Sequence, residues 1–226
     1  MSTLIEALIP YLIFFLPGML SCGTYPAVIA FSIHRELIRL FAYTIPALAL
    51  ILYLHQRPVR SAICIPKPRL SDLRVFMICL PGLILLGFGV SILSSLAAVI
   101  FAGSFFIPLS PHVEAPGSPP AWLVMAISCL GTGYLEESYF RFYLLPRLED
   151  AGIGKGRSIF FSTLLFSCCH IYEGPWGILN AALAGLGLSV VFMKHRSLHG
   201  IAWAHGGYNG FVYILSGWQL PVHQCL

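Results

Sequence analysis

Long apolar stretches alternate with short polar segments along the whole chain. Each stretch approaches the roughly 20 helical residues that cross the hydrocarbon core of a bilayer, which is about 30 Å thick. Because an unpaired backbone amide is costly in lipid, such stretches are expected to be helices. The pattern predicts an all-α, polytopic transmembrane bundle of about seven helices (six to eight), near residues 3–21, 38–54, 75–103, 120–146, 157–174, 177–193 and 199–217.

Two departures from this regular pattern are expected. Proline lacks an amide hydrogen and crowds the carbonyl group four residues earlier, so helices are expected to bend or end at Pro17, Pro81 and Pro146. Residues 57–74 mix cations with aliphatic side chains, which is typical of a segment lying along the lipid headgroups. The sequence therefore predicts an interfacial segment there.

Lys and Arg residues cluster in every second connection between the predicted spans. The positive-inside rule assigns such connections to the cytoplasm. The predicted topology has the N-terminus in the cytoplasm and the C-terminus outside, although Arg35 and Arg39 in the first predicted loop go against it. Ten of the thirteen cations follow the rule, namely Arg57, Arg60, Lys67, Arg69, Arg74, Arg147, Lys155, Arg157, Lys194 and Arg196.

The composition supports a membrane protein with a single domain. Hydrophobic residues make up 58% of the 226 residues and charged residues 10%, against roughly 45–50% and about 25% in soluble domains. Residues 1–226 are therefore interpreted as one integral membrane domain. The formal charge of +4 is spread between apolar runs, so no nucleic-acid partner is expected. The seven cysteines show no C-x-x-C spacing and are interpreted as packing residues.

Ionisable side chains lie inside the fourth predicted span, where they are costly and by default suggest function. Glu136, Glu137 and Arg141 occur there in an otherwise apolar or weakly polar run. Glu137 and Arg141 are four residues apart, so they share a helix face and can pair. Glu136 points about 100° away, which leaves one carboxylate free to face a cavity. Glu136 is therefore the candidate general base, with a purely structural charge cluster as the alternative.

Two later spans each carry a histidine with a partner one turn away. His170 follows Phe166 by four residues, and His205 precedes Asn209 by four. A lone histidine in an apolar helix is more often a packing residue than a catalyst, but three polar motifs together favour a site. At about 1.5 Å per residue, Glu136, His170 and His205 are expected roughly 16, 20 and 9 Å from the cytoplasmic ends of their helices. The three side chains can therefore meet at one intramembrane level.

The three motifs together resemble the pattern of a known family. The order E-E-x-x-x-R, F-x-x-x-H and H-x-x-x-N is similar to that of the CPBP family (CAAX-protease and bacteriocin-processing, formerly Abi), which includes the type II CAAX prenyl endopeptidases. The resemblance covers residues 120–217, and the N-terminal part matches only in hydropathy and approximate helix count. Phe142 departs from the family, in which many members have glycine directly after the arginine.

The resemblance implies an intramembrane endopeptidase with its catalytic helices at residues 120–217. Glu136 and His170 would activate a water molecule, and His205 and Asn209 would stabilise the oxyanion. The implied site consists of catalytic Glu136, His170, His205 and Asn209 with supporting Glu137, Arg141 and Phe166.

Neither the cofactor nor the reaction class is fixed by the residues alone. Glu136, His170 and His205 can instead be a Zn²⁺ site with one position open to water. The metal-free mechanism is favoured because the H-E-x-x-H motif is absent. Aspartyl and serine chemistry are disfavoured because Asp72 and Asp150 lie in predicted loops and no G-x-S-x-G motif occurs.

The expected partners are the lipid bilayer and a membrane-embedded or membrane-associated peptide, in a bacterial or archaeal cell membrane. Processing of a signal or bacteriocin peptide is preferred over that of a prenylated protein. Two other functions remain open. Buried polar groups also join helices in a non-catalytic immunity or scaffold protein, and they relay protons in a proton-coupled transporter.

Overall fold

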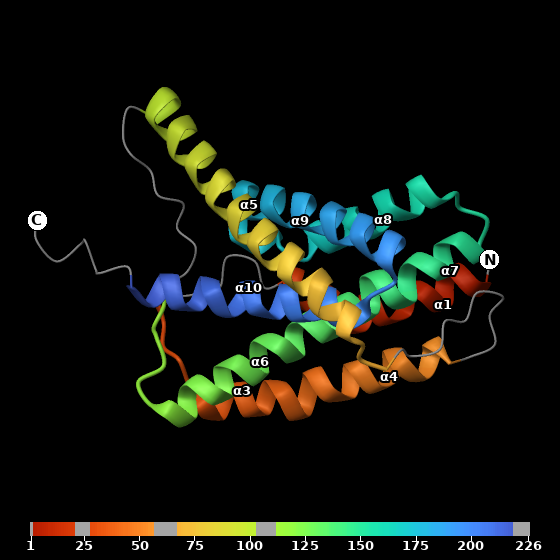
Figure 1. The fold of residues 1–226 in the computed structure, drawn as a ribbon, viewed down its shortest axis with the longest axis horizontal. Coiled ribbons are helices and arrows are strands. Elements are labelled where there is room, and N and C mark those ends of the chain that lie inside the picture. Colours follow the sequence, from red (N-terminus) through yellow and green to blue (C-terminus); the bar gives the residue numbers. More distant parts are fainter. Residues whose placement is uncertain (1, 21–27, 57–66, 103–111, 219–226) are drawn as a thin grey trace, which may run out of the picture.

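The computed structural model describes residues 2–20, 28–56, 67–102 and 112–218. These residues form seven continuous helices, three of which contain a π-helical segment (Figure 1). The only strands in these four ranges are β1 (Val28–Ile29) and β2 (His112–Val113), which pair in parallel. The helices are α1–η1–α2 (Ser2–Pro10, Tyr11–Phe15, Leu16–Leu20), α3–η2–α4 (Ile33–Arg39, Leu40–Thr44, Ile45–His55), α5 (Leu70–Ala102), α6–η3–α7 (Pro119–Glu137, Ser138–Leu144, Leu145–Asp150), α8 (Lys155–Cys168), α9 (Gly174–His195, preceded by the 3-10 turn η4, Ile171–Glu173) and α10 (Leu198–Trp218).

The predicted all-α membrane bundle is confirmed. Three helical stretches, Ile33–His55, Leu70–Phe101 and Ile171–His195, are long and apolar enough to cross a membrane by length and composition. Most of their side chains face outward, since 17–33% of each apolar window is buried within the bundle. Apolar side chains on the outside of a bundle are the surface that lipid covers. The chain is therefore an integral membrane protein.

Prolines mark the three π-helical segments. Pro17, Pro46 and Pro146 each lie two residues after the end of η1, η2 or η3, and the helix continues beyond each of them. A proline has no amide hydrogen for the carbonyl group four residues earlier, and a wider turn before the proline relieves the crowding. The helices therefore do not end at Pro17 or Pro146, and of the expected bend or end only a bend remains as a prediction. Pro81 lies inside α5, which also continues through it.

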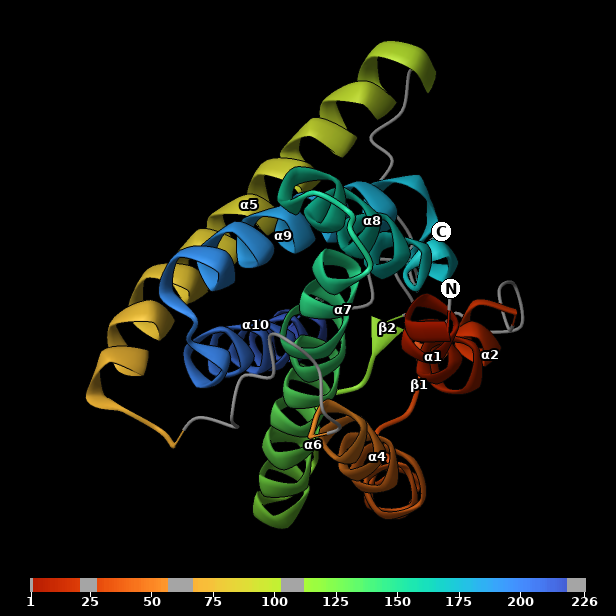
Figure 2. The same ribbon diagram turned by 90° about the vertical axis from the view of Figure 1, so that its right-hand side faces the viewer.

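The η3 segment lies at the centre of the molecule. All seven of its residues are buried. In Figure 2, α6 and α7 run between α5, α9 and α10 on one side and α1 and α4 on the other. Tyr139, Phe140, Tyr143 and Leu144 belong to a core with α1, α4 and α8, whereas Phe142 belongs to a second core with α5, α9 and α10. The motif that carries the predicted site is therefore the most enclosed part of the described chain.

Three predicted helix boundaries are wrong. The second helix begins at Ile33 and not near residue 38, because Ser32 caps its N-terminus, so Arg35 and Arg39 lie on α3 and not in a loop. The fifth helix, α8, ends at Cys168 and not near residue 174, so His170 lies in the turn that follows it.

The third helix, α5, begins at Leu70, so residues 70–74 of the predicted interfacial segment are its first turns, and their place along the headgroups stays a prediction. Residues 57–66 of that expected segment lie outside the described residues. Asp72, expected in a loop, lies in the first turn of α5. There its carboxylate accepts hydrogen bonds from the Arg69 amide at 2.7 Å and the Ser197 hydroxyl at 2.6 Å.

Helix ends from the predicted cytoplasmic connections gather at one end of the bundle. In Figure 1 the end of α4, the start of α5, the turn between α7 and α8 and the turn between α9 and α10 all lie toward the right. The starts of α3 and α6 and the ends of α5 and α10 lie toward the left. This arrangement agrees with the alternation of cations along the sequence, and which end faces the cytoplasm stays a prediction.

Candidate active site

Glu137 is the centre of a buried ionic network. Its side chain is fully buried, and Oε1 lies 2.9 Å from Arg141 Nη1 and 2.7 Å from His205 Nδ1. The ion pair predicted from the spacing of four is therefore present, and it includes a histidine from α10 as well. Oε2 of Glu137 finds no hydrogen-bond donor among the described residues.

Arg141 links η3 to two further helices. Its guanidinium donates to the Gly185 carbonyl of α9 at 3.1 Å and to the Ser189 hydroxyl at 3.4 Å. The guanidinium carbon also lies 4.4 Å from the centre of the Phe166 ring on α8, which is a cation–π contact. Arg141 thus ties together helices that carry different parts of the predicted site.

Glu136 occupies a different environment from its neighbour. Its side chain is 17% exposed, and Oε2 lies 3.5 Å from His205 Nε2. That oxygen is itself buried, and it has no hydrogen-bond donor within the described ranges. Tyr43 of η2 and Cys169 lie close enough to interact with Glu136 electrostatically. Glu136 is therefore a carboxylate that is largely withdrawn from solvent but still reachable.

The two nitrogens of His205 face the two glutamates. A carboxylate only accepts, so Nδ1 must donate its hydrogen to Glu137. A neutral ring would then direct a lone pair from Nε2 toward Glu136, whereas an imidazolium directs a second N–H. The two flanking carboxylates balance the charge of the imidazolium. His205 can therefore act as a hydrogen-bond donor on the side of Glu136.

His170 is oriented by the end of α8. Its Nδ1 lies 2.9 Å from the Phe166 carbonyl oxygen, which only accepts, so the hydrogen is on Nδ1 and Nε2 keeps its lone pair in the neutral ring. The Phe166 ring lies 4.8 Å from the His170 ring and 5.9 Å from the His205 ring, centre to centre. Phe166 therefore separates and positions the two histidines.

Asn209 lies one turn beyond His205 on α10 and is half-buried. Its side chain makes no hydrogen bond to any other described residue. The amide is thus available to a bound molecule on the same helix face as His205.

Two glycines bring the helices of the site together. A Cβ atom on Gly133 of α6 would lie 2.7 Å from the Ala202 carbonyl oxygen and 2.8 Å from the Gly206 nitrogen of α10. A Cβ atom on Gly206 would lie 2.8 Å from the Cα atom of Leu130. The backbones of α6 and α10 therefore touch directly beside Glu137 and His205. Sequence reasoning did not recognise the packing role of Gly133.

The side chains of the alternative Zn²⁺ site do not converge as ligands. No three His, Cys, Asp or Glu side chains in the described parts of the chain are arranged to hold a metal ion. His205 also directs one nitrogen to Glu137 and the other to Glu136. Glu136, His170 and His205 therefore do not fit the tetrahedral arrangement that Zn²⁺ prefers.

The comparison with protein families identifies this region. A family model described as type II CAAX prenyl endopeptidase Rce1-like matches residues 118–211. Residues 118–211 are therefore similar to the CAAX-protease family. The match begins at the start of α6, ends within α10 and includes all three motifs, so it confirms the resemblance seen in the sequence. Comparisons with curated proteins and with solved structures found no match.

Phe142, the departure from the CAAX-protease pattern, has a clear packing role. Its ring stacks on His55 of α4 with the ring centres 4.0 Å apart and meets Phe192 of α9 edge-on at 6.5 Å. The side chain is 1% exposed. Phe142 therefore fills space between α4 and α9.

The N-terminal helices also pack beside the candidate site. Phe15 of η1 packs on Tyr139 and Phe140 with ring centres 5.0 Å away, and the Tyr43 hydroxyl donates to the Phe14 carbonyl at 2.6 Å. These contacts bring η1, η2 and η3 together beside Glu136. Sequence reasoning missed them because aromatic residues in an apolar helix give no sign of what they face.

Proposed function

We propose that the chain is an intramembrane endopeptidase that hydrolyses a peptide bond in a membrane-associated or lipid-modified peptide. The observation that carries this proposal is the contrast between the two adjacent carboxylates. Glu137 is fully buried and paired with Arg141, whereas Glu136 is 17% exposed and has His205, 3.5 Å away, as its only ion-pair partner among the described residues. A carboxylate that is poorly solvated yet accessible is suited to accept a proton from water.

In the proposed reaction, Glu136 accepts a proton from water as the water oxygen bonds to the carbonyl carbon of the peptide. His170 orients the same water through the lone pair on Nε2. His205 and Asn209 donate hydrogen bonds to the oxyanion, which are more effective in an enclosed, poorly solvated site than in bulk water. When the carbon–nitrogen bond breaks, Glu136 returns the proton to the leaving amine.

The proposed setting is a bacterial or archaeal cell membrane with the N-terminus in the cytoplasm. The gathering of cationic connections at one end of the bundle supports this orientation. The proposed substrates are signal or bacteriocin peptides, with prenylated proteins as the second choice.

The decisive experiment compares wild type with Glu136→Gln. Both proteins are purified in detergent and incubated with a panel of internally quenched, lipid-anchored peptides. Loss of a general base is expected to lower the cleavage rate by about 100-fold or more, with unchanged thermal unfolding. Glu114→Gln, an exposed residue before α6, is the matched control. Full activity of Glu136→Gln refutes the assignment, and proton flux in vesicles without cleavage indicates a transporter instead.

A further inference from the structure

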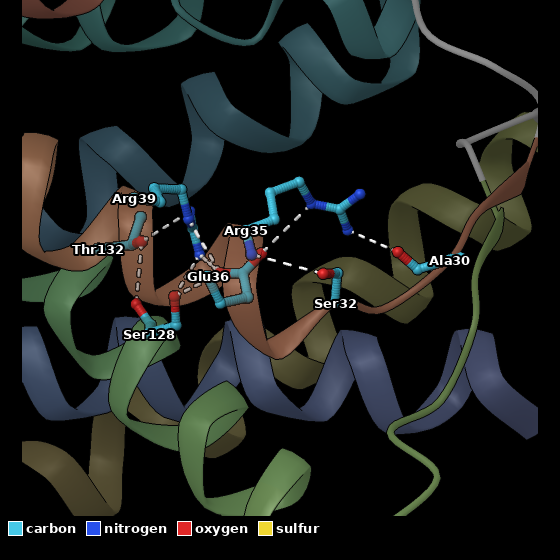
Figure 3. Close-up of polar contacts among 7 residues, drawn as sticks. All are labelled: Ala30, Ser32, Arg35, Glu36, Arg39, Ser128 and Thr132. Atoms are coloured by element: carbon cyan, nitrogen blue, oxygen red, sulfur yellow. Dashed lines mark hydrogen bonds and ion pairs between the residues drawn. The ribbon is translucent and has the colours of Figure 1, made fainter.

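A second ionic cluster, in which Glu36 is buried and Arg39 is partly exposed, joins α3 to α6 (Figure 3). Glu36 is 5% exposed, and its Oε2 accepts from Arg39 Nη2 at 2.6 Å and from Arg39 Nε at 3.0 Å. The same oxygen accepts from the Ser128 hydroxyl of α6 at 2.6 Å. Arg39 also donates to Ser128 Oγ at 2.6 Å and to Thr132 Oγ1 at 3.3 Å. Every polar link in this cluster between the two helices thus ends on Ser128 or Thr132.

The contacted residues lie on the face of α6 that carries the candidate base. Ser128, Thr132 and Glu136 are spaced by four, so they form a row along one side of the helix, about 6 Å apart along its axis. Tyr43, which lies near Glu136, follows Arg39 by four residues on the opposing helix. The α3 helix therefore contacts α6 along the same row of residues that ends at Glu136.

Helix packing alone does not require this cluster. An ion pair made by a buried carboxylate such as Glu36 loses much of its Coulomb attraction to desolvation, and apolar residues of similar size are often as stabilising. Arg39 also goes against the distribution of cations that sets the topology. Hydrogen bonds differ from apolar contacts in being directional, so they fix the rotation of one helix against another. Glu36 and Arg39 are thus better suited to fixing the orientation of α6 than to stabilising its contact with α3.

We propose that Glu36 and Arg39 are positioning residues for Glu136, which they orient by fixing α6 through Ser128 and Thr132. This inference rests on the proposed role of Glu136 as the base. A misplacement of about 1 Å at a reacting group can lower a rate by about 100-fold. Small rotations of α6 therefore change turnover more than substrate binding.

The test uses variants that remove the directional hydrogen bonds between α3 and α6 without leaving a buried charge unpaired. Thr132→Val and the double variant Glu36→Met with Arg39→Met are assayed in vesicles with the same quenched, lipid-anchored peptides. Both are expected to lower kcat by about 10-fold or more, with KM within about twofold of wild type and thermal unfolding unchanged. Thr132→Ser, which keeps the hydroxyl, recovers most of the rate lost in Thr132→Val. Arg35→Gln is the matched control because Arg35 is exposed on the same helix, and its own ion pair with Glu36 is long, at 4.0 Å, and screened by solvent.

A second measurement does not depend on peptide cleavage. Dicyclohexylcarbodiimide reacts with carboxyl groups in apolar surroundings, and mass spectrometry gives the rate of labelling at Glu136. The positioning role predicts that this rate changes at least severalfold in Thr132→Val and in the double Met variant, and stays at the wild-type value in Arg35→Gln. Wild-type kcat and labelling in both altered variants overturn the inference. Altered labelling in a protein that cleaves no peptide refutes only the proposed peptidase function.

Discussion

His205 Nδ1 and Arg141 Nη1 both lie within 3 Å of one oxygen of Glu137, at 2.7 and 2.9 Å. The histidine of the third motif is therefore oriented by the glutamate of the first motif, and not by its own helix. Because Nδ1 is committed to Glu137, only Nε2 faces Glu136 and any molecule bound beside it. Glu137 is thus both a structural partner of Arg141 and the group that fixes the ring of His205.

Glu137→Gln is expected to weaken the fold and the site together. The amide keeps the size of the side chain but removes the charge that balances Arg141. Removal of one partner from a buried ion pair costs roughly 3–5 kcal/mol in the free energy of unfolding. Denaturation in detergent and the peptide assay measure the two effects. Glu137→Gln with wild-type stability contradicts the central place of this carboxylate.

Arg141→Lys tests the geometry of the cation apart from its charge. A lysine ammonium cannot reach Glu137, Gly185 and Ser189 at once, whereas the planar guanidinium does. Each lost hydrogen bond is worth about 1 kcal/mol, so the free energy of unfolding is expected to fall by about 2 kcal/mol. If Arg141→Lys unfolds at the same denaturant concentration as wild type, the positive charge at position 141 is sufficient for stability, and the hydrogen-bond geometry of the guanidinium adds nothing.

Sequence reasoning located the helices and the separate motifs because both depend on local spacing. Seven spans follow from the length of apolar runs, and the Glu137–Arg141 pair follows from a spacing of four. The bond between Glu137 and His205 joins residues 68 positions apart, so no local pattern predicts it. The same reason explains why Arg39 was taken for a loop residue, since its partners Ser128 and Thr132 are on α6.

Gly133→Ala is expected to separate α6 from α10. The new Cβ atom would lie 2.7 Å from the Ala202 carbonyl oxygen and 2.8 Å from the Gly206 nitrogen, and backbone atoms cannot turn aside as a side chain can. Overpacking of this kind costs about 1–3 kcal/mol and moves Glu136 relative to His205. Peptide cleavage should therefore fall more than expression does. Gly187→Ala on α9, where the Cβ atom meets nothing within 4 Å, is the control. Equal activity of the two variants would show that the close contact of α6 with α10 at Gly133 is not needed for cleavage.

Metal chelation is expected to leave the cleavage rate unchanged. Three ligands must converge on Zn²⁺, and His205 is already placed between two carboxylates while His170 is turned toward its own helix end. The assay is repeated with EDTA and with 1,10-phenanthroline, and the zinc content of the purified protein is measured by mass spectrometry. A known zinc peptidase in the same detergent shows that the chelators work. Loss of cleavage that is restored by added Zn²⁺ would show that Glu136, His170 and His205 rearrange to bind the metal during the reaction.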